Sequence, residues 1–493
     1  MRINVVGSLV TAACALAGGI LLFPNIVLGG GAVVGPVPPP PLPPNIVRLT
    51  PQEQLGKFML YDSTLSNPVG YACASCHVPE TGFTGPNSEI NALGCDTPGV
   101  VPGRVGNRKP YTYNYAAFSP EGPYLDPQAG VYIGGQFWDG RASDTAAQAQ
   151  GPPVNPNEMN NTPATAPNDP TFTYAPLLVA KLAKRPYTPL FKQVYGKHAF
   201  FYNTPGQIYE LFSEAIAAYE ASPEICQFSS RFDASIYGVP AQTKYTLTAS
   251  EERGRELYFG QAQCFQCHSA ANFSTVTETS GGKDTFTMYC YANIGTPKNR
   301  FNPYYQLTRP SNPGYNPLGF AYVDYGLGDF LYPKQGLPIA NMGPGSNGRG
   351  DFLAINGLFL TPTTRNSDKR PFPTFVKDYM HNGFFKSLKQ VVHFYNTRNH
   401  TTVPGEVINF SQPNPYAGLL GTPLWPPPEV PSPITLTNPT GAPPLAPGVS
   451  PPPGTNGYGQ IGNLGLTPQQ ENDVVAFLAI LTDGYTKPNP VTP

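Results

Sequence analysis

Two short motifs hold the residues whose types and spacing point most clearly to chemistry. The first is Cys-Ala-Ser-Cys-His at residues 73–77, and the second is Cys-Phe-Gln-Cys-His at residues 264–268, which begins 264 − 73 = 191 residues later. Cys-x-x-Cys-His is the attachment signature of c-type haem, because both thiols can form thioethers with one porphyrin and the next histidine then lies beneath the iron. The sequence therefore predicts two covalent haem groups, each with a histidine on its iron, held by Cys73, Cys76 and His77 and by Cys264, Cys267 and His268.

Two other uses of a Cys-x-x-Cys pair fit this sequence less well. A zinc site needs a second pair of Cys or His ligands nearby, and 191 residues is far beyond the usual spacing. A thioredoxin-like redox site needs neither the following histidine nor a second copy. The chain has only 6 His, so two of them directly after Cys-x-x-Cys are hard to attribute to chance.

Length and composition limit the class of protein. The 493 residues are enough for two domains with separate cores. The net charge of −1 argues against nucleic acid as a partner. Charged residues make up 12% of the chain, whereas 61 Pro and 51 Gly predict many loops and turns.

The N-terminal residues 1–48 predict export. Arg2 precedes an apolar run from Val5 to about Phe23, as in a signal peptide, but the run continues through residues 26–28, so an uncleaved anchor is the alternative. A Pro-rich spacer follows at residues 36–44. A periplasmic or cell-surface location suits haem c, which is normally attached outside the cytoplasm.

Four of the eight cysteines belong to the two motifs, and Cys14 lies in the leader. The remaining three are Cys95, Cys226 and Cys290. In an oxidising compartment we expect one disulfide and one free thiol among them, and the sequence leaves the pairing open.

The elements that must position the motifs share a helix-start signal. Thr50-Pro51-Gln52-Glu53 predicts a capping box, and the same signal recurs at residues 248–251 and 467–470. A capped helix before each Cys-x-x-Cys-His motif indicates duplication of a small helical haem domain; coincidence of a common cap is the alternative. We expect a boundary near residues 235–246, which gives domains 49–240 and 241–493. A Pro-rich insertion at 409–459 predicts a long loop in the second domain.

The sequence resembles the bacterial di-haem cytochrome c peroxidases and their MauG-type relatives over nearly all of residues 50–485. Besides the two haem motifs, the segments that carry the resemblance are Leu55–Lys57, Phe137–Ala142, Gln148, Asn155–Met159, Thr361–Asn366 and Tyr379–Gly383. The resemblance implies a mainly α fold, in which two cytochrome c-like haem domains with long Pro/Gly-rich loops face a shared interface.

The resemblance also assigns roles to side chains. It implies that the first haem binds peroxide and that the second transfers electrons. Glu158 matches the pocket carboxyl that moves a proton between the peroxide oxygens, and Gln148 matches an amide that orients peroxide. Trp138 matches the aromatic residue between the haems, and Arg141 is expected to pair with a haem propionate.

The axial ligands of the irons distinguish the subtypes of the family. Tyr395 falls where many relatives supply a Met to the second iron, which is the MauG-type arrangement; a phenolate favours ferric and higher-valent iron. Classical members of the family carry a His after the first motif that can block the first iron. No His lies between His77 and His198 here, so the comparison with the family implies a first iron that is open at rest. The resemblance also implies a calcium ion between the domains, held partly by Asn107, and carboxamide and carbonyl oxygens suit calcium.

The sequence therefore predicts an exported di-haem peroxidase that reduces hydrogen peroxide. The electron source is either a small c-type cytochrome or cupredoxin, or side chains of a partner protein, as in MauG. The alternative is a non-enzymatic di-haem electron-transfer protein, in which both irons would be six-coordinate and Glu158 would have no role.

Overall fold

The computed structural model describes residues 37–94, 96–126, 130–161, 176–238, 244–269, 280–310, 315–331, 355–398, 425–430 and 461–485. The predicted leader up to residue 36, Cys95, the predicted domain boundary at residue 240 and most of the insertion 409–459 lie outside these residues.

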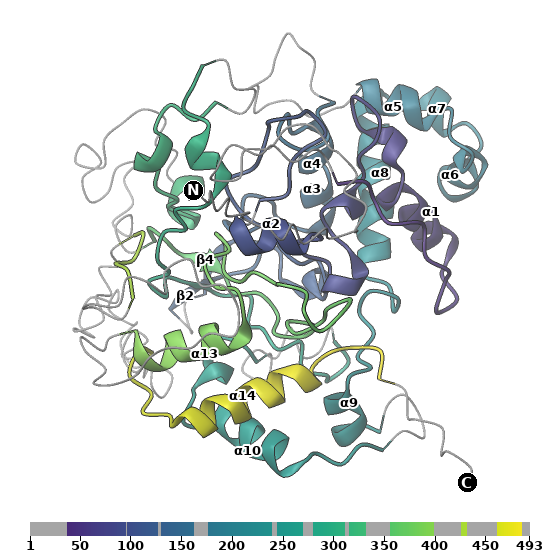
Figure 1. Ribbon diagram of the computed structural model, residues 1–493. Coiled ribbons are helices and arrows are strands. Elements are labelled where there is room, and N and C mark those ends of the chain that lie inside the picture. Colours follow the sequence, from purple (N-terminus) through teal and green to yellow (C-terminus); the bar gives the residue numbers. More distant parts are fainter. Residues whose placement is uncertain are drawn as a thin grey trace, which may run out of the picture.

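Helices dominate the described chain, as Figure 1 shows. The α-helices are α1 (Pro51–Leu60), α2 (Ser88–Leu93), α3 (Thr145–Ala149), α4 (Gly151–Val154), α5 (Pro176–Leu182), α6 (Thr188–Tyr195), α7 (Ala199–Tyr202), α8 (Pro205–Glu220), α9 (Arg231–Ile236), α10 (Ala249–Tyr258), α12 (Leu327–Leu331), α13 (Leu388–Thr397) and α14 (Pro468–Ile480). Short 3₁₀ turns cover Ser63–Leu65, Cys73–Ser75, Pro79–Thr81, Ala116–Phe118, Cys264–Gln266, Pro303–Gln306 and Gly319–Ala321. The mainly α prediction is confirmed.

Two small antiparallel strand pairs lie between the helical parts. Strand β1 (Tyr124–Asp126) pairs with β2 (Val131–Ile133), and β3 (Tyr291–Ala292) pairs with β4 (Phe359–Leu360). A bridge between Ile133 and Cys290 joins the two pairs, so segments far apart in the sequence meet here.

The predicted helix starts form as capping boxes. The Thr50 hydroxyl accepts a hydrogen bond from the Glu53 N–H at 3.3 Å, and the Thr50 N–H donates to the Glu53 carboxylate at 2.6 Å. The boxes at Thr248 and Thr467 show the same reciprocal pattern. Each box satisfies two of the backbone donors that a helix start leaves unpaired.

The helices α1 and α10 cross their partners in the same way. A Cβ on Gly56 of α1 would lie 1.8 Å from the Ala215 carbonyl oxygen of α8, and a Cβ on Gly254 of α10 would lie 1.9 Å from the Asp473 carbonyl oxygen of α14. Both glycines stand six positions after the threonine of their capping box. The missing side chains let each helix pair approach closely, and this repeated crossing agrees with an internal duplication.

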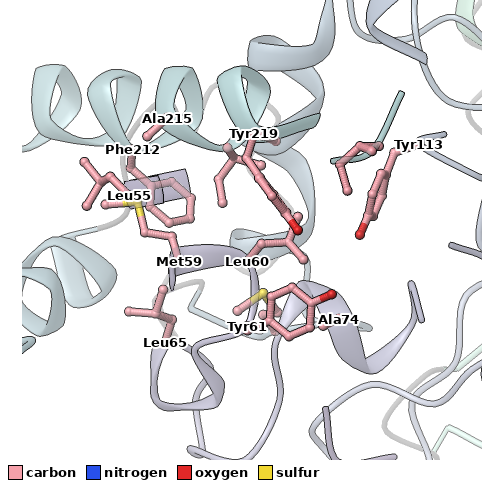
Figure 2. Close-up of a cluster of buried hydrophobic side chains, with 14 of the residues drawn as sticks. Leu55, Met59, Leu60, Tyr61, Leu65, Ala74, Tyr113, Phe212, Ala215 and Tyr219 are labelled. Atoms are coloured by element: carbon pink, nitrogen blue, oxygen red, sulfur yellow. The ribbon is translucent and has the colours of Figure 1, made fainter. Parts of the chain in front are cut away.

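Separate cores surround the two crossings. One buried cluster draws its side chains from Leu55 to Phe228, and Figure 2 shows its centre between α1 and α8. Another cluster runs from Phe232 to Leu481 and packs α10, α13 and α14. No helix in the described ranges combines the length and apolar character needed to cross a bilayer.

Candidate active site

The first Cys-x-x-Cys-His motif lines a cavity of about 370 Å³. Cys73 starts a 3₁₀ turn that Cys76 ends, and the turn brings the His77 N–H to the Cys73 carbonyl oxygen at 3.1 Å. The His77 Nδ1 atom lies 2.9 Å from the Phe83 carbonyl oxygen, so Nδ1 carries the proton and Nε2 keeps a lone pair. Burial lowers the pKa of His77 to about 4, which keeps the imidazole neutral, as iron ligation requires.

The second motif repeats this arrangement in a cavity of about 220 Å³. The His268 Nδ1 atom lies 3.0 Å from the Pro362 carbonyl oxygen, and burial lowers the pKa of His268 to about 4. Cys264 and Cys267 line the same wall. In each cavity, two thiols and a neutral, oriented imidazole stand together, which is the donor set that haem c requires. The residues therefore fit the group.

The predicted acid–base and amide residues, Glu158 and Gln148, line the first cavity and not the second. Glu158 and Gln148 share this cavity with His77. Burial raises the pKa of the Glu158 carboxyl, while the nearby Arg141 charge and a 2.6 Å hydrogen bond from the Asn155 amide oppose that rise. Gln148 sits on α3, whose start is capped by the Asp144 carboxylate. The structure thus brings the two predicted pocket residues together beside the first motif.

A second carboxyl of the first cavity was missed in the sequence. Glu220, at the end of α8, is 4% exposed and lines the cavity. Burial raises its pKa to about 8, and no basic side chain of the described chain forms an ion pair with it. The sequence did contain a sign of this burial. Glu220 follows the apolar residues Phe212 and Ile216 at intervals of four, which places all three on the same, buried face of α8.

Trp138 lines both cavities. Its indole N–H donates to the Lys109 carbonyl oxygen at 2.9 Å. Its ring packs edge-on against Tyr111 at 4.8 Å and against His381 at 6.4 Å. The indole is 8% exposed and therefore stands, fixed and almost dry, where the two cavities adjoin.

The second cavity contains Tyr395 on α13, together with Met380 and His381. Burial raises the pKa of the Tyr395 phenol, and the Cys267 and Cys264 thiols raise it further. The start of α13 at Ser387 forms only half of a capping box. The Ser387 hydroxyl caps Gln390, but the Gln390 side chain accepts from the Lys386 N–H instead of closing the box.

Comparisons with known proteins agree with this arrangement. The family model of di-haem cytochrome c peroxidases matches residues 50–240. The methylamine utilization protein MauG of Paracoccus denitrificans is 30% identical over 343 residues, which are 69% of this chain and 73% of that protein. The chain belongs to the di-haem cytochrome c peroxidase and MauG family.

Two further family members match over most of their length. A cytochrome-c peroxidase of Pseudomonas sp. is 25% identical over 364 residues, which are 74% of this chain and 76% of that protein. The crystal structure of the di-haem peroxidase BthA from Burkholderia thailandensis superposes with a TM-score of 0.57 at 26% identity, over 93% of this chain and 96% of that one. As a member of this family, the chain is a di-haem peroxidase with haem c as its cofactor, and the electron-carrier alternative is not favoured.

Other predicted residues of this di-haem peroxidase have clear positions. Arg141 lines the first cavity, where its guanidinium binds Asp139 at 2.9 Å and lies 3.5 Å from the Phe137 ring centre. Asn107 also lines the first cavity, and its amide donates to the Tyr322 hydroxyl at 2.8 Å.

Two described histidines outside the motifs contact protein side chains. His381 stacks on Phe359 with ring centres 3.6 Å apart. His393 pairs with Glu471 of α14 at 2.8 Å. Among the described residues that line the first cavity, His77 is the sole histidine.

The remaining cysteines differ from the expected disulfide. Cys226 and Cys290 are both buried free thiols, so neither forms the predicted bridge, and Cys95 lies outside the described residues. The Cys290 thiol contacts that of Cys267 in the second motif. The Cys226 thiol contacts the Glu220 carbonyl oxygen and the Cys290 thiol contacts the Thr361 hydroxyl, so the two thiols lie in different surroundings.

Proposed function

We propose that this di-haem peroxidase reduces hydrogen peroxide in the first cavity with electrons that enter through the second. The supporting observation is an asymmetry of the cavities: Glu158 and Gln148 line only the first, Tyr395 lines only the second, and Trp138 lines both. Peroxide, two electrons and two protons give two molecules of water. The first cavity therefore needs a group that handles protons, and the boundary needs a path for electrons.

Haem c, bound through both motifs, supplies the iron for peroxide binding and electron exchange. Glu158 accepts the proton of the near peroxide oxygen and delivers it to the far oxygen, from which water leaves. Burial raises the pKa of the Glu158 carboxyl, so its protonated and ionised forms are closer in free energy near neutral pH. The same group can therefore first accept a proton and then donate it. The Gln148 amide donates a hydrogen bond that orients peroxide.

The proposal extends to attachment, ligation and location. The thioethers form on Cys73, Cys76, Cys264 and Cys267, and Arg141 pairs with a propionate. With haem bound, Tyr395 would be the side chain that ligates the second iron. Among the described residues of the first cavity, His77 is the sole histidine, so no second imidazole there would compete with peroxide for the first iron. A calcium ion held partly by Asn107 stays in the proposed cofactor set, because carboxamide oxygens suit calcium and Asn107 lines the first cavity. The chain is exported, and its N-terminus serves as signal or anchor.

The electron source follows from the same residues. A Tyr-ligated second iron and an open first iron favour high-valent chemistry of the MauG type, in which side chains of a partner protein supply electrons. A small cytochrome or cupredoxin is the other source. Steady-state oxidation of reduced cytochrome, compared with peroxide-dependent modification of co-exported proteins, distinguishes the two.

The experiment that tests the function is stopped-flow mixing of the ferric holoprotein with hydrogen peroxide. We expect rapid spectral change in the wild type and a loss of roughly 10²–10⁴-fold in peroxide turnover for Glu158→Gln. Glu214→Gln on the exposed face of α8 is the matched control and should behave as wild type. No spectral change in the wild type would instead support an electron carrier, and unchanged turnover in Glu158→Gln would remove this carboxyl from the mechanism.

The pH profile gives a second readout for Glu158. Because the ionised carboxylate is the base, activity should fall as pH drops through its raised pKa, and the acid limb of the profile should lie above the ordinary value near 4.5. Glu158→Gln should abolish that limb. Persistence of the same limb in the variant would assign it to another group.

A further inference from the structure

Each motif histidine donates to a backbone carbonyl oxygen of a loop. The acceptor for His77 lies in residues 78–84, here called the first loop, and the acceptor for His268 lies in residues 361–367, the second loop. The Thr81 hydroxyl lies 2.9 Å and 2.8 Å from two carbonyl oxygens of the first loop, which fixes the shape of that loop. The orientation of a metal-ligating histidine depends on its second hydrogen bond. The placement of the two haem centres therefore depends on where the two loops lie against each other.

The two loops touch at Gly82 and Asn366. A Cβ on Gly82 would lie 2.8 Å from the Asn366 carbonyl oxygen, and the φ angle of Gly82 is +71°. Both observations favour glycine here, because any other side chain would push the loops apart. Gly82 lines the second cavity although it belongs to the first loop. The loop that holds the first histidine thus reaches the cavity of the second motif.

Lys377 binds both loops beside this contact. Its ammonium donates to the Thr81 carbonyl oxygen of the first loop at 2.7 Å and to the Asn366 carbonyl oxygen of the second loop at 3.2 Å. A third bond, at 3.0 Å, goes to the Lys369 carbonyl oxygen. The side chain is 4% exposed and burial lowers its pKa, but three oxygens that can only accept favour the form with three protons. One buried cation therefore holds a backbone oxygen of each loop.

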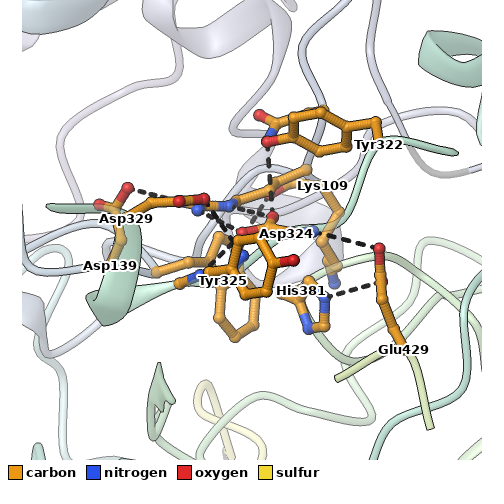
Figure 3. Close-up of polar contacts among 12 residues, drawn as sticks. Lys109, Asp139, Tyr322, Asp324, Tyr325, Asp329, His381 and Glu429 are labelled. Atoms are coloured by element: carbon orange, nitrogen blue, oxygen red, sulfur yellow. Dashed lines mark hydrogen bonds and ion pairs between the residues drawn. The ribbon is translucent and has the colours of Figure 1, made fainter. Parts of the chain in front are cut away.

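The segment that carries this lysine is fixed to the first half of the chain on both sides. Just before the lysine, the Val376 N–H donates to the Ser88 hydroxyl at 2.9 Å. Just after it, the Asp378 carbonyl oxygen accepts from the Lys109 ammonium at 2.7 Å, and Figure 3 shows Lys109 near the buried polar contacts of His381. The ammonium therefore reaches the two loops from a fixed backbone.

We propose that Lys377 joins the two loops and thereby positions both motif histidines, so that it sets how the two haem centres lie relative to each other. Lys377 lines the second cavity and not the first. Its charge alone would act mainly on the second haem, whereas its bonds to both loops also reach the first. The inference rests on the proposed ligation of the irons by His77 and His268, which paramagnetic resonance of the wild type tests without any variant.

The first test is Lys377→Met, which removes the three donors but keeps a long unbranched side chain. The control is Lys386→Met. Lys386 is 3% exposed and donates to the Gly94 and Gly383 carbonyl oxygens at 2.7 Å and 2.6 Å, and neither oxygen belongs to the first or the second loop. Redox titration and low-temperature paramagnetic resonance of the holoprotein follow each haem separately.

We expect Lys377→Met to shift the midpoint potentials and the ferric g values of both haems, and to slow electron transfer between them roughly tenfold or more. The control should keep the wild-type values. A shift confined to the second haem would mean that Lys377 acts through its charge alone, which would overturn the proposal. Equal shifts in the two lysine variants would assign the effect to general loosening and overturn it as well.

The second test separates the loops without changing any charge. Gly82→Ala places a methyl group against the Asn366 carbonyl oxygen, so the signals of both haems should change. Gly281→Ala is the matched control, because Gly281 has a similar φ of +67° and nothing within 4 Å of its Cβ. If Lys377→Met does not accumulate, this pair decides the proposal, and wild-type signals from both haems in Gly82→Ala would refute it.

Discussion

Trp138 donates its indole N–H to the Lys109 carbonyl oxygen at 2.9 Å, and both residues line both cavities that contain the haem motifs. Among the described residues that line both cavities, Trp138 is the sole aromatic side chain, and this hydrogen bond fixes its indole in place. This relationship makes Trp138 the first residue to test.

Trp138→Phe should slow electron transfer between the two haems while preserving both. The variant leaves the Lys109 carbonyl without its buried donor, which costs about 1–3 kcal/mol of unfolding free energy. Trp425→Phe is a matched control, because its buried indole donates to the Thr397 hydroxyl at 3.1 Å yet lines neither cavity. Rapid-freeze paramagnetic resonance after peroxide addition measures the transfer. Equal rates in the two variants would exclude a relay through Trp138.

Tyr395→Met should raise the reduction potential of the second haem, because a thioether favours ferrous iron and a phenolate favours ferric iron. Redox titration of the two haems measures the shift. Tyr379→Phe serves as control, since Tyr379 also lines the second cavity but uses its hydroxyl on the Ser367 carbonyl oxygen at 3.1 Å. A potential that stays the same in Tyr395→Met would show that Tyr395 is not an iron ligand.

Glu220→Gln should stabilise the protein at high pH. The pKa of Glu220 rises from 4.5 in the unfolded chain to about 8 in the folded one, so the wild type loses stability as pH increases across that interval. The glutamine variant should gain up to about 4 kcal/mol at pH 8, from 1.36 kcal/mol per pH unit, and almost nothing near pH 4. Urea unfolding of holoprotein at several pH values tests this, with exposed Glu214→Gln as control. A pH dependence identical to that of the wild type would contradict it.

Gly56→Ala and Gly254→Ala should each destabilise one haem domain. Each new methyl group would lie within 2 Å of a partner carbonyl oxygen, so the helices must separate, which costs about 1–3 kcal/mol or more. Gly106→Ala is the control, because the nearest atom to its Cβ is 3.8 Å away. Thermal unfolding followed at each haem should show loss in α1–α8 for the first variant and in α10–α14 for the second. Full stability of either variant would refute the close crossing.

The features that depend on local sequence were predictable. Both haem motifs, the capping boxes at Thr50, Thr248 and Thr467, and the mainly α class follow from residues close together in the chain. Trp138, Glu158 and Tyr395 came from the family resemblance, and the structure places each of them on the wall of a cavity that also contains a haem motif.

The features that depend on long-range packing were not predictable. Arg108 and Lys109 look like ordinary surface cations in the sequence, because their acidic partners lie up to 269 residues away. Glu220 became a buried acid only through the packing of α8 against the first cavity. The expected disulfide failed for the same reason, since burial leaves Cys226 and Cys290 as thiols in different surroundings.

The two glycine-containing helix crossings affect how a local defect acts on the protein. Helix α1 packs on α8 at Gly56 beside the first haem motif, and α10 packs on α14 at Gly254 beside the second. Proteolysis or a harmful substitution in one pair should disable the haem centre beside it first and leave the other spectroscopically intact.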